Sequence, residues 1–344
     1  MSTFALIGLG SNVGDREATL GRAVAALGRL PGTRLHSFSR HHTTAPVGGP
    51  GGQGEFLNAA ALLRTSLSAR DLLGSLHEIE RSEGRERIVH WGERTLDLDL
   101  LLHGDSVIDE ADLVVPHPRM SVRRFVLAPA VEIAPRLVDP LTGRTLDRLL
   151  ANLDRRPTQI SILAPPGPPT ASLIEALAGH FGSSLVRGPS CGIDSGETLA
   201  TEADESRFRS AFDDFLEGNR IESTPEPIGG ASLLLNLAWY DQFAVIAQRR
   251  YASNPCRLLP FLDAWKRGRA FLRAPTFVIF WDPPWPGPGE NLEGRSAEGW
   301  LGLAPAYRSH LASRLRTDPV LHVRSPRLGD AVEEAVAAFA ASRG

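Results

Sequence analysis

Residues 95–102 constrain the fold more than any other stretch, because leucine and aspartate alternate there at the period of a β-strand. Successive side chains of a strand point to opposite faces. The intervening leucines therefore face a core, whereas Asp97 and Asp99 lie together on the other face. We expect a sheet with one buried face and with two adjacent carboxylates on the opposite face.

The elements expected before this strand give the order βαββαβ. Strands are expected at residues 4–9, 35–40 and 56–63, and helices at 15–30 and 68–82, the second opened by a capping box of Ser68 and Asp71. This order predicts a ferredoxin-like α+β domain, in which helices cover one face of an antiparallel sheet and the other face stays free for a site. Residues 116–153 would add closing helices, the last at 146–153.

A second domain is expected, because 344 residues exceed one domain of roughly 150 residues. Residues 154–157 have the composition of a linker, and five of the six tryptophans follow residue 238. We place domains at 1–156 and 157–344. The hydrophobic patterns predict that the second domain is α/β. We expect strands at 159–163 and 276–280, a loop at 164–171, and helices from 172 and at 207–217, 231–250 and 331–341.

Charge and cysteine content narrow the class of protein. The net charge is −3, so we expect small-molecule substrates rather than a nucleic acid or a membrane surface as partners. Cys191 and Cys256 are the only cysteines, which excludes a disulfide framework. The N-terminal apolar run is too short for a signal sequence, and no run of about 18 apolar residues occurs. We therefore expect a cytoplasmic protein.

Asp97 and Asp99 are candidate metal ligands, because two neighbouring carboxylates repel each other unless a cation binds between them. Oxygen ligands at this spacing suit Mg²⁺. The alternative is a solvated strand face.

Basic side chains cluster in the sequence around this strand, and they are Arg85, Arg87, Arg94, His117, Arg119, Arg123 and Arg124. Guanidinium groups grip phosphate oxygens, so a metal with several arginines indicates a polyphosphate substrate and phosphoryl or pyrophosphoryl transfer. A surface salt-bridge lattice with Glu80, Glu83 and Glu86 is the competing explanation.

Several separate blocks resemble one family, and they occur in its order over about residues 4–153. They are LGSNVGD (9–15), FLNAA (56–60), GRER (84–87), WGERTLDLDL (91–100), VPHPRM (115–120), RFVLAP (124–129) and EIAP (132–135). These blocks resemble 6-hydroxymethyl-7,8-dihydropterin pyrophosphokinase of folate biosynthesis. The resemblance implies a ferredoxin-like fold and transfer of pyrophosphate from ATP to the pterin hydroxymethyl group, with release of AMP.

The resemblance also implies roles for individual residues. Asp97 and Asp99 would bind two Mg²⁺ ions, and Arg85, Arg87, Arg94, His117 and Arg123 would surround the ATP triphosphate, with Arg85 and Arg94 acting in catalysis together with the two aspartates. The pterin would be bound by Thr44, Pro46, Val47, Phe56, Asn58, Trp91 and Phe125. A flat heteroaromatic ring needs aromatic faces and a directional amide, and Phe56, Phe125 and Asn58 offer these.

Two loops, residues 44–54 and 83–93, flank this predicted site. We interpret both as lids that exclude water, with Trp91 closing one of them. Ala45, His90 and Glu93 depart from the family pattern without touching the metal pair.

The glycines at 8–14 allow a second interpretation, a dinucleotide-binding turn of an oxidoreductase, but no acidic residue follows at the required distance. A tight turn with positive φ is the structural explanation for these glycines.

The second half resembles a deoxynucleoside kinase with a P-loop. Residues 164–174 align with the phosphate-binding loop, and 276–284 with a late strand and its Asp-x-Pro turn. Thr170 and Ala171 replace the lysine and the metal-binding hydroxyl, and Pro168 and Pro169 lack the backbone N–H groups of a phosphate cradle. We therefore expect a P-loop-kinase-like domain that acts as a non-catalytic binding module or forms a homodimer. An active nucleoside kinase with an atypical loop is the alternative.

Overall fold

The computed structural model describes residues 2–47, 52–84, 94–155, 158–164, 168–181, 185–190, 202–218, 233–237, 239–272, 274–283, 295–313 and 318–343. The chain divides into two compact units, Met1–Asp154 with Ala337–Gly344, and Arg155–Val336. None of the helices in these ranges is long and apolar enough to cross a membrane.

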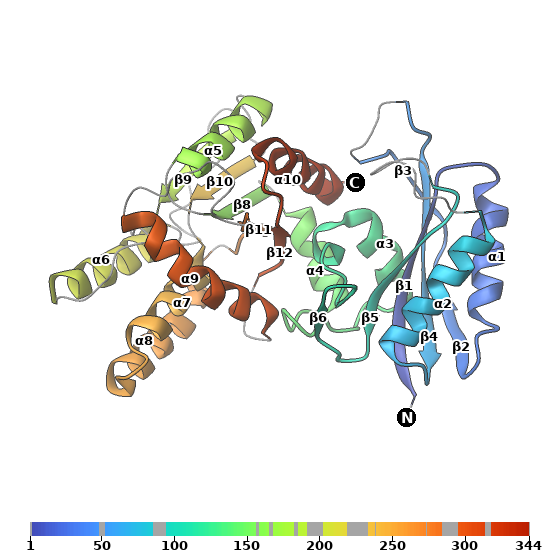
Figure 1. The fold of residues 1–344 in the computed structure, drawn as a ribbon, viewed down its shortest axis with the longest axis horizontal. Helices are drawn as coiled ribbons and strands as arrows, with labels where there is room; N and C mark the ends of the chain where they lie inside the picture. The colour runs from blue at the N-terminus through green and yellow to red at the C-terminus, as the bar shows by residue number, and fades with distance from the viewer. Residues whose placement is uncertain are drawn as a thin grey trace. The chain divides into compact units, whose positions relative to one another are not determined.

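The first unit contains an antiparallel sheet, shown in Figure 1. Its strands are β1 (Thr3–Ser11), β2 (Thr33–Phe38), β3 (His42–Thr44), β4 (Phe56–Thr65) and β5 (Asp97–His103). The order is β2-β4-β1-β5, and β3 also pairs with β4. The expected strands are present, and the ferredoxin-like arrangement is confirmed.

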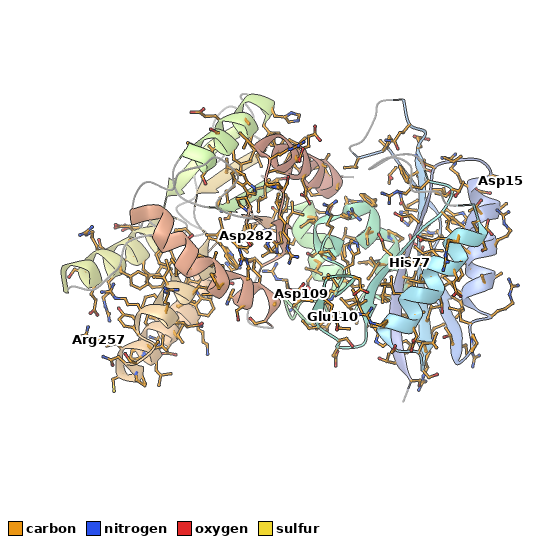
Figure 2. All side chains as sticks on the ribbon, viewed as in Figure 1. Asp15, His77, Asp109, Glu110, Arg257 and Asp282 are labelled. Atoms are coloured by element: carbon orange, nitrogen blue, oxygen red, sulfur yellow. The ribbon has the colours of Figure 1, made fainter. Side chains whose placement is uncertain are left out.

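Helices α1 (Arg16–Leu27) and α2 (Ala69–Ser82) cover one face of this sheet (Figure 1). Asp15, labelled at the start of α1 in Figure 2, accepts a hydrogen bond from the backbone N–H of Ala18 at 3.0 Å. Ser68 accepts one from Asp71 N–H at 3.1 Å, so the expected helix start is confirmed. The alternate leucines of β5 join Leu20 and Leu72 in the core on this side.

The opposite face of the sheet is not wholly free, which corrects our expectation. Helices α3 (Arg124–Ile133) and α4 (Leu146–Asp154) pack on it over a second core that includes Leu6, Leu62 and Leu102. The sequence placed closing helices here but did not indicate the face they cover. The carboxylates of this face remain accessible, since the Asp97 and Asp99 side chains keep 20% and 29% of their area exposed.

Several short elements in the first unit were missed. They are β3, the hairpin of β6 (Ile108–Glu110) and β7 (Leu113–Val115), and the 3-10 helix η1 (Met120–Val122). Strand β1 also continues through Ser11, so Gly10 lies within a strand and not in a turn. Among the glycines of 8–14, only Gly14 has a positive φ, at 67°. Our explanation of the other glycines as turn residues is therefore wrong.

The second unit contains a parallel sheet with the order β12-β11-β8-β10-β9. Its strands are β8 (Thr158–Leu163), β9 (Leu185–Ser190), β10 (Leu233–Leu237), β11 (Phe277–Trp281) and β12 (Val320–Val323). Its helices are α5 (Pro168–Phe181), α6 (Glu202–Gly218), α7 (Tyr240–Arg250), α8 (Pro255–Gly268), the 3-10 helix η4 (Arg269–Phe271), α9 (Arg295–Ala312) and α10 (Leu328–Arg343), whose last residues cluster with the first unit. Strands and helices alternate as expected of an α/β domain.

Two boundaries in this unit differ from our expectation. The helix expected at 231–250 is in fact strand β10 followed by helix α7. A short apolar run fits a buried strand and a buried helix equally well, so the run of leucines was misassigned. The loop expected at 164–171 is in part the first turn of α5, where proline is tolerated because the first N–H groups of a helix have no intrahelical acceptor.

Candidate active site

Four residues form a row across the antiparallel sheet. His42 pairs with Asn58, Asn58 with Gly10, and Gly10 with Asp97. Residues directly opposite each other on antiparallel strands project from the same face. The amide of Asn58 and the carboxylate of Asp97 therefore share a face, and only a glycine lies between them.

The next row of the sheet repeats this arrangement. Ala60 pairs with Gly8, and Gly8 pairs with Asp99. Asp97 and Asp99 thus lie on one face, as the alternation predicted, and strand β1 contributes no side chain beside either of them.

The two carboxylates face basic side chains. Arg94 NH1 lies 2.5 Å from Asp97 Oδ2, Arg123 NH1 lies 3.7 Å from Asp99 Oδ2, and His117 Nε2 lies 3.8 Å from Asp99 Oδ1. These three residues come from the segment before β5 and from the segment that leads into α3. The structure therefore brings Arg94, His117 and Arg123 of the predicted basic cluster to the acidic pair, whereas Arg124 pairs with Asp154 instead.

His117 is held as a neutral hydrogen-bond donor. Burial lowers the pKa of its imidazole, and the charge of Asp99, which raises that pKa, only partly opposes the effect of burial. Its Nδ1 accepts the backbone N–H of Arg119 at 3.1 Å, so the ring proton lies on Nε2, the nitrogen that faces Asp99. Burial likewise lowers the pKa of Arg123. The neutral Nε2–H of His117 and the guanidiniums of Arg94 and Arg123 therefore all face the carboxylates of Asp97 and Asp99.

The competing salt-bridge lattice is not formed by the described residues. Glu83 pairs with Arg22, 2.6 Å away, and Arg124 pairs with Asp154 at 3.0 Å. Glu80 is buried and accepts the backbone N–H of Leu98 at 2.7 Å. Glu86 lies outside the described residues. Among the described residues, Arg94 lies beside Asp97 and Arg123 lies beside Asp99, whereas Glu83 is paired with Arg22.

The predicted ring-binding residues on β3 and β4 lie across β1 from the acidic pair, whereas Phe125 lies beside Arg123. Asn58 is 6% exposed, and its Nδ2 donates to Thr44 Oγ1 at 2.8 Å, so one amide hydrogen bond is already fixed. Phe56 begins β4 and pairs with Thr44. Phe125 lies in the first turn of α3 beneath the Arg123 guanidinium, which is 5.6 Å from the ring centroid. Pro46 and Val47 follow β3 and are half-buried.

Some predicted residues lie outside the described residues. They are Arg85, Arg87, His90, Trp91 and Glu93, together with part of the glycine-rich loop. Their predicted places around the site therefore stay predictions.

The first unit is similar to proteins of known activity. The family model for 7,8-dihydro-6-hydroxymethylpterin-pyrophosphokinase matches residues 6–135. The 2-amino-4-hydroxy-6-hydroxymethyldihydropteridine pyrophosphokinase of Synechocystis is 41% identical over 150 residues, which are 44% of this chain and 76% of that protein. The Pseudomonas aeruginosa enzyme of the same name is 44% identical, over 42% of this chain and 88% of its own length. The chain belongs to this pyrophosphokinase family.

The hydroxymethyldihydropterin pyrophosphokinase assignment makes the chain an enzyme of folate biosynthesis that uses ATP as co-substrate and Mg²⁺. The Lactococcus lactis bifunctional protein FolKE is 41% identical over 37% of this chain and 36% of its own length. A Plasmodium falciparum HPPK-DHPS structure covers 94% of this chain and 81% of that one at 11% identity, but its TM-score is 0.35, which assigns no fold to the second unit.

The dinucleotide alternative is not favoured. A dinucleotide-binding turn joins a parallel strand to a helix, and a second parallel strand must follow. In this pyrophosphokinase the strand before the glycines pairs antiparallel with both of its neighbours.

The acidic pair of the pyrophosphokinase fits Mg²⁺. Within the described residues, no group of three or more His, Cys, Asp or Glu side chains could hold a metal ion. A pair of half-exposed carboxylates nevertheless suits Mg²⁺, which keeps several waters and takes substrate phosphate oxygens as further ligands. Asp97 and Asp99 would hold it.

Asn12 was missed by the sequence analysis. Its Oδ1 accepts the backbone N–H of Arg94 at 2.7 Å, and its own N–H donates to the carbonyl of Arg94 at 3.1 Å. Its Nδ2 donates to Gln53 Oε1 at 3.4 Å. Asn12 thus links the ends of the two predicted lid loops. The block LGSNVGD contains this residue, but the sequence alone gave it no partner.

Proposed function

We propose that Asp97 and Asp99 hold two Mg²⁺ ions, and that Arg94, His117 and Arg123, together with Arg85 and Arg87, bind the ATP triphosphate. The carrying observation is that the two carboxylates face two guanidiniums and a neutral imidazole within 2.5–3.8 Å. Such donors are suited to the negative charge of transferring phosphoryl groups.

The pterin would lie at the other end of the row. Asn58 would recognise an edge of the ring, with its orientation fixed by Thr44, while Phe56 and Phe125 would stack on the ring faces. Pro46, Val47 and Trp91 would complete this subsite, and the loops at 44–54 and 83–93 would close over it to exclude water.

The proposed chemistry is an in-line displacement. The hydroxymethyl oxygen of the pterin forms a bond to the β-phosphorus of ATP, the bond from that phosphorus to the α,β-bridging oxygen breaks, AMP leaves with the electron pair, and the hydroxyl proton is released. Mg²⁺, when bound, neutralises charge on the phosphate oxygens. Arg94 and Arg123 stabilise the charge that develops, and His117 donates its Nε2 proton as a hydrogen bond.

The test is AMP formation by the full chain with ATP, Mg²⁺ and 6-hydroxymethyl-7,8-dihydropterin. Asp97→Ala and Asp99→Ala should each abolish turnover with little effect on pterin binding, whereas Asn58→Ala should weaken pterin binding first. Asp109→Ala, in the β6 hairpin, is the matched control and should keep wild-type turnover. Near-normal turnover by the double variant of Asp97 and Asp99 would refute the metal assignment.

For the second unit we propose a domain related to deoxynucleoside kinases that no longer transfers phosphate, with domain limits of 1–156 and 157–344. Strand β8 has β10 on one side and β11 on the other, so connections diverge at its carboxyl end, where α/β proteins bind ligands. Residue 164 and helix α5 follow directly, which is the position of a phosphate-binding loop. Thr170 and Ala171 stand there in place of the lysine and the hydroxyl that phosphate transfer requires.

This proposal has its own test in the full chain. A variant with both Asp97→Ala and Asp99→Ala, given ATP and deoxynucleosides, should form no deoxynucleoside monophosphate. Product formation would favour the alternative, an active kinase with an atypical loop. We propose further that the unit binds an unphosphorylated ligand or forms a homodimer. Sedimentation of the full chain would detect the homodimer. We also propose that the protein acts in the cytoplasm on small molecules.

A further inference from the structure

Gly10 occupies the point of the sheet where the proposed subsites meet. A Cβ atom built on Gly10 would lie 3.4 Å from Asn58 Oδ1, 3.9 Å from Phe56 Cδ1 and 4.0 Å from Asp97 Cβ. One methyl group at this position would therefore contact the amide, the aromatic ring and the base of the carboxylate side chain together.

The backbone does not require glycine at this position. Gly10 lies inside β1 and is paired on both sides, and its φ is not in the positive region that favours glycine. A protein with glycine in a strand interior is less stable than the same protein with alanine there, because glycine loses more conformational entropy on folding and packs no side chain. No atom would lie closer than 3.4 Å to the added Cβ, so alanine fits the unliganded protein.

Gly10 and Gly8 form a strip of β1 that has no side chains of its own between β4 and β5, but the Leu101 side chain covers the Gly8 end, where it lies 3.4 Å from a Cβ built on that glycine. Asn58 and Ala60 border the strip on one side, and Asp97 and Asp99 border it on the other. Two strand spacings separate β4 from β5, about 9.5 Å. At the Gly10 end, that width accommodates a bicyclic heteroaromatic ring whose substituent extends toward Asp97.

We infer that Gly10 is a specificity-determining residue, which keeps the floor of the pterin subsite bare so that a ring held by Asn58 can extend its hydroxymethyl group to the nucleotide at Asp97. This inference rests on the proposed function. It explains a glycine at a position where the fold itself would accept, and would gain stability from, a larger residue.

Gly10→Ala in the full chain tests the inference. We expect the affinity for 6-hydroxymethylpterin, measured by calorimetry with a non-hydrolysable ATP analogue and Mg²⁺ present, to fall about tenfold or more, because a methyl group would occupy the ring's space. Affinity for the ATP analogue alone should stay within about twofold, and the melting temperature should be equal to that of the wild type or higher. A merely structural glycine would instead give a lower melting temperature.

Two further variants separate the possible failures. Gly21→Ala in α1 is the matched control, because its Cβ would meet nothing within 4 Å, and it should leave pterin affinity unchanged. If Asn58→Ala weakens pterin binding while Gly10→Ala leaves it within about twofold of the wild type, the role of Gly10 is refuted and the pterin subsite stands. If neither variant changes pterin binding, the subsite itself is misplaced and the inference falls with it.

Discussion

Asn12 and Arg94 exchange two hydrogen bonds, one through the Asn12 side chain at 2.7 Å and one between their backbones at 3.1 Å. Arg94 in turn contacts Asp97, so the Asn12 amide fixes the backbone from which this guanidinium reaches the carboxylate. Asn12 is a positioning residue in this arrangement.

Asn12→Ala should lower kcat about ten- to hundredfold, since small displacements of a catalytic group have effects of that size. The free energy of unfolding should fall by only about 1 kcal/mol, the contribution of one hydrogen bond. Asn12→Asp keeps an acceptor for the Arg94 N–H and should recover most of the rate. The positioning role would be excluded if both variants lost activity equally, as measured by AMP formation.

Arg94 must share Asp97 with any metal that binds there, because its NH1 lies 2.5 Å from the carboxylate. Arg94→Ala should therefore raise the affinity for Mg²⁺ in the absence of ATP about three- to tenfold, in line with about 1 kcal/mol for a partly exposed ion pair. The same variant should lose turnover, because the guanidinium no longer reaches the phosphates. Calorimetric titration with Mg²⁺ measures the first effect, and a weaker affinity would contradict the competition.

The sequence was most informative where a feature depends on neighbouring residues alone. The Ser68 cap and the alternation around Asp97 are local patterns, and the structure has both. Strand β3 is only three residues long and has no periodicity of its own, so its pairing with β4 could not be predicted. The same holds for the leucines of β10, whose strand conformation depends on parallel neighbours far along the chain.

The candidate site was predictable to a similar degree. Asp97 and Asp99 could be placed on one face from their spacing, the basic residues were candidates because they cluster in the sequence around that strand, and the family resemblance added Asn58. Asn12 could not be assigned, because Arg94 is 82 residues away in the sequence. The importance of Gly10 likewise becomes visible only when β4 and β5 are seen on both sides of it.

Glu132 on α3 links the helix to the start of β3. Its carboxylate accepts hydrogen bonds from the Arg40 backbone at 3.1 Å and the Arg40 side chain at 2.8 Å, and it lies 2.9 Å from His42 Nε2. The Arg40 hydrogen bond holds the pKa of Glu132 below its ordinary value of 4.5. The corresponding stability is therefore present above pH 4.5 and is lost as the pH falls through the folded-state pKa.

Glu132→Gln should accordingly reduce the free energy of unfolding by about 1 kcal/mol or less at neutral pH, because Arg40 is largely exposed. The difference from wild type should shrink as the pH is lowered toward about 3. Urea denaturation at several pH values measures this. In an Arg40→Ala background the same substitution should have a smaller effect, and an unchanged effect would show that Arg40 is not the partner that matters.

Asp282 directly follows β11 and is labelled in Figure 2. It is the aspartate of the segment 276–284, which resembles the late strand and Asp-x-Pro turn of deoxynucleoside kinases. Its side chain is 5% exposed, and it accepts hydrogen bonds from Arg308 Nε at 2.5 Å and Arg308 NH2 at 2.8 Å. His322 Nε2 lies 3.4 Å away. Burial raises the pKa of Asp282, but the hydrogen bonds from Arg308 and the nearby His322 ring outweigh this, so its pKa lies below the ordinary value. The carboxylate is thus charged and occupied in joining β11 to α9.

Arg308→Ala should destabilise the second unit by about 2–3 kcal/mol, because it leaves a buried carboxylate short of its main partner. Adding Asp282→Asn should recover part of that loss, since a neutral amide is less costly to bury than an unpaired charge. Urea denaturation of the full chain, followed by fluorescence of the tryptophans that are concentrated in the second half, reports on this unit. If the double variant were no more stable than Arg308→Ala, the cost would come from lost packing of the arginine side chain and not from the ion pair.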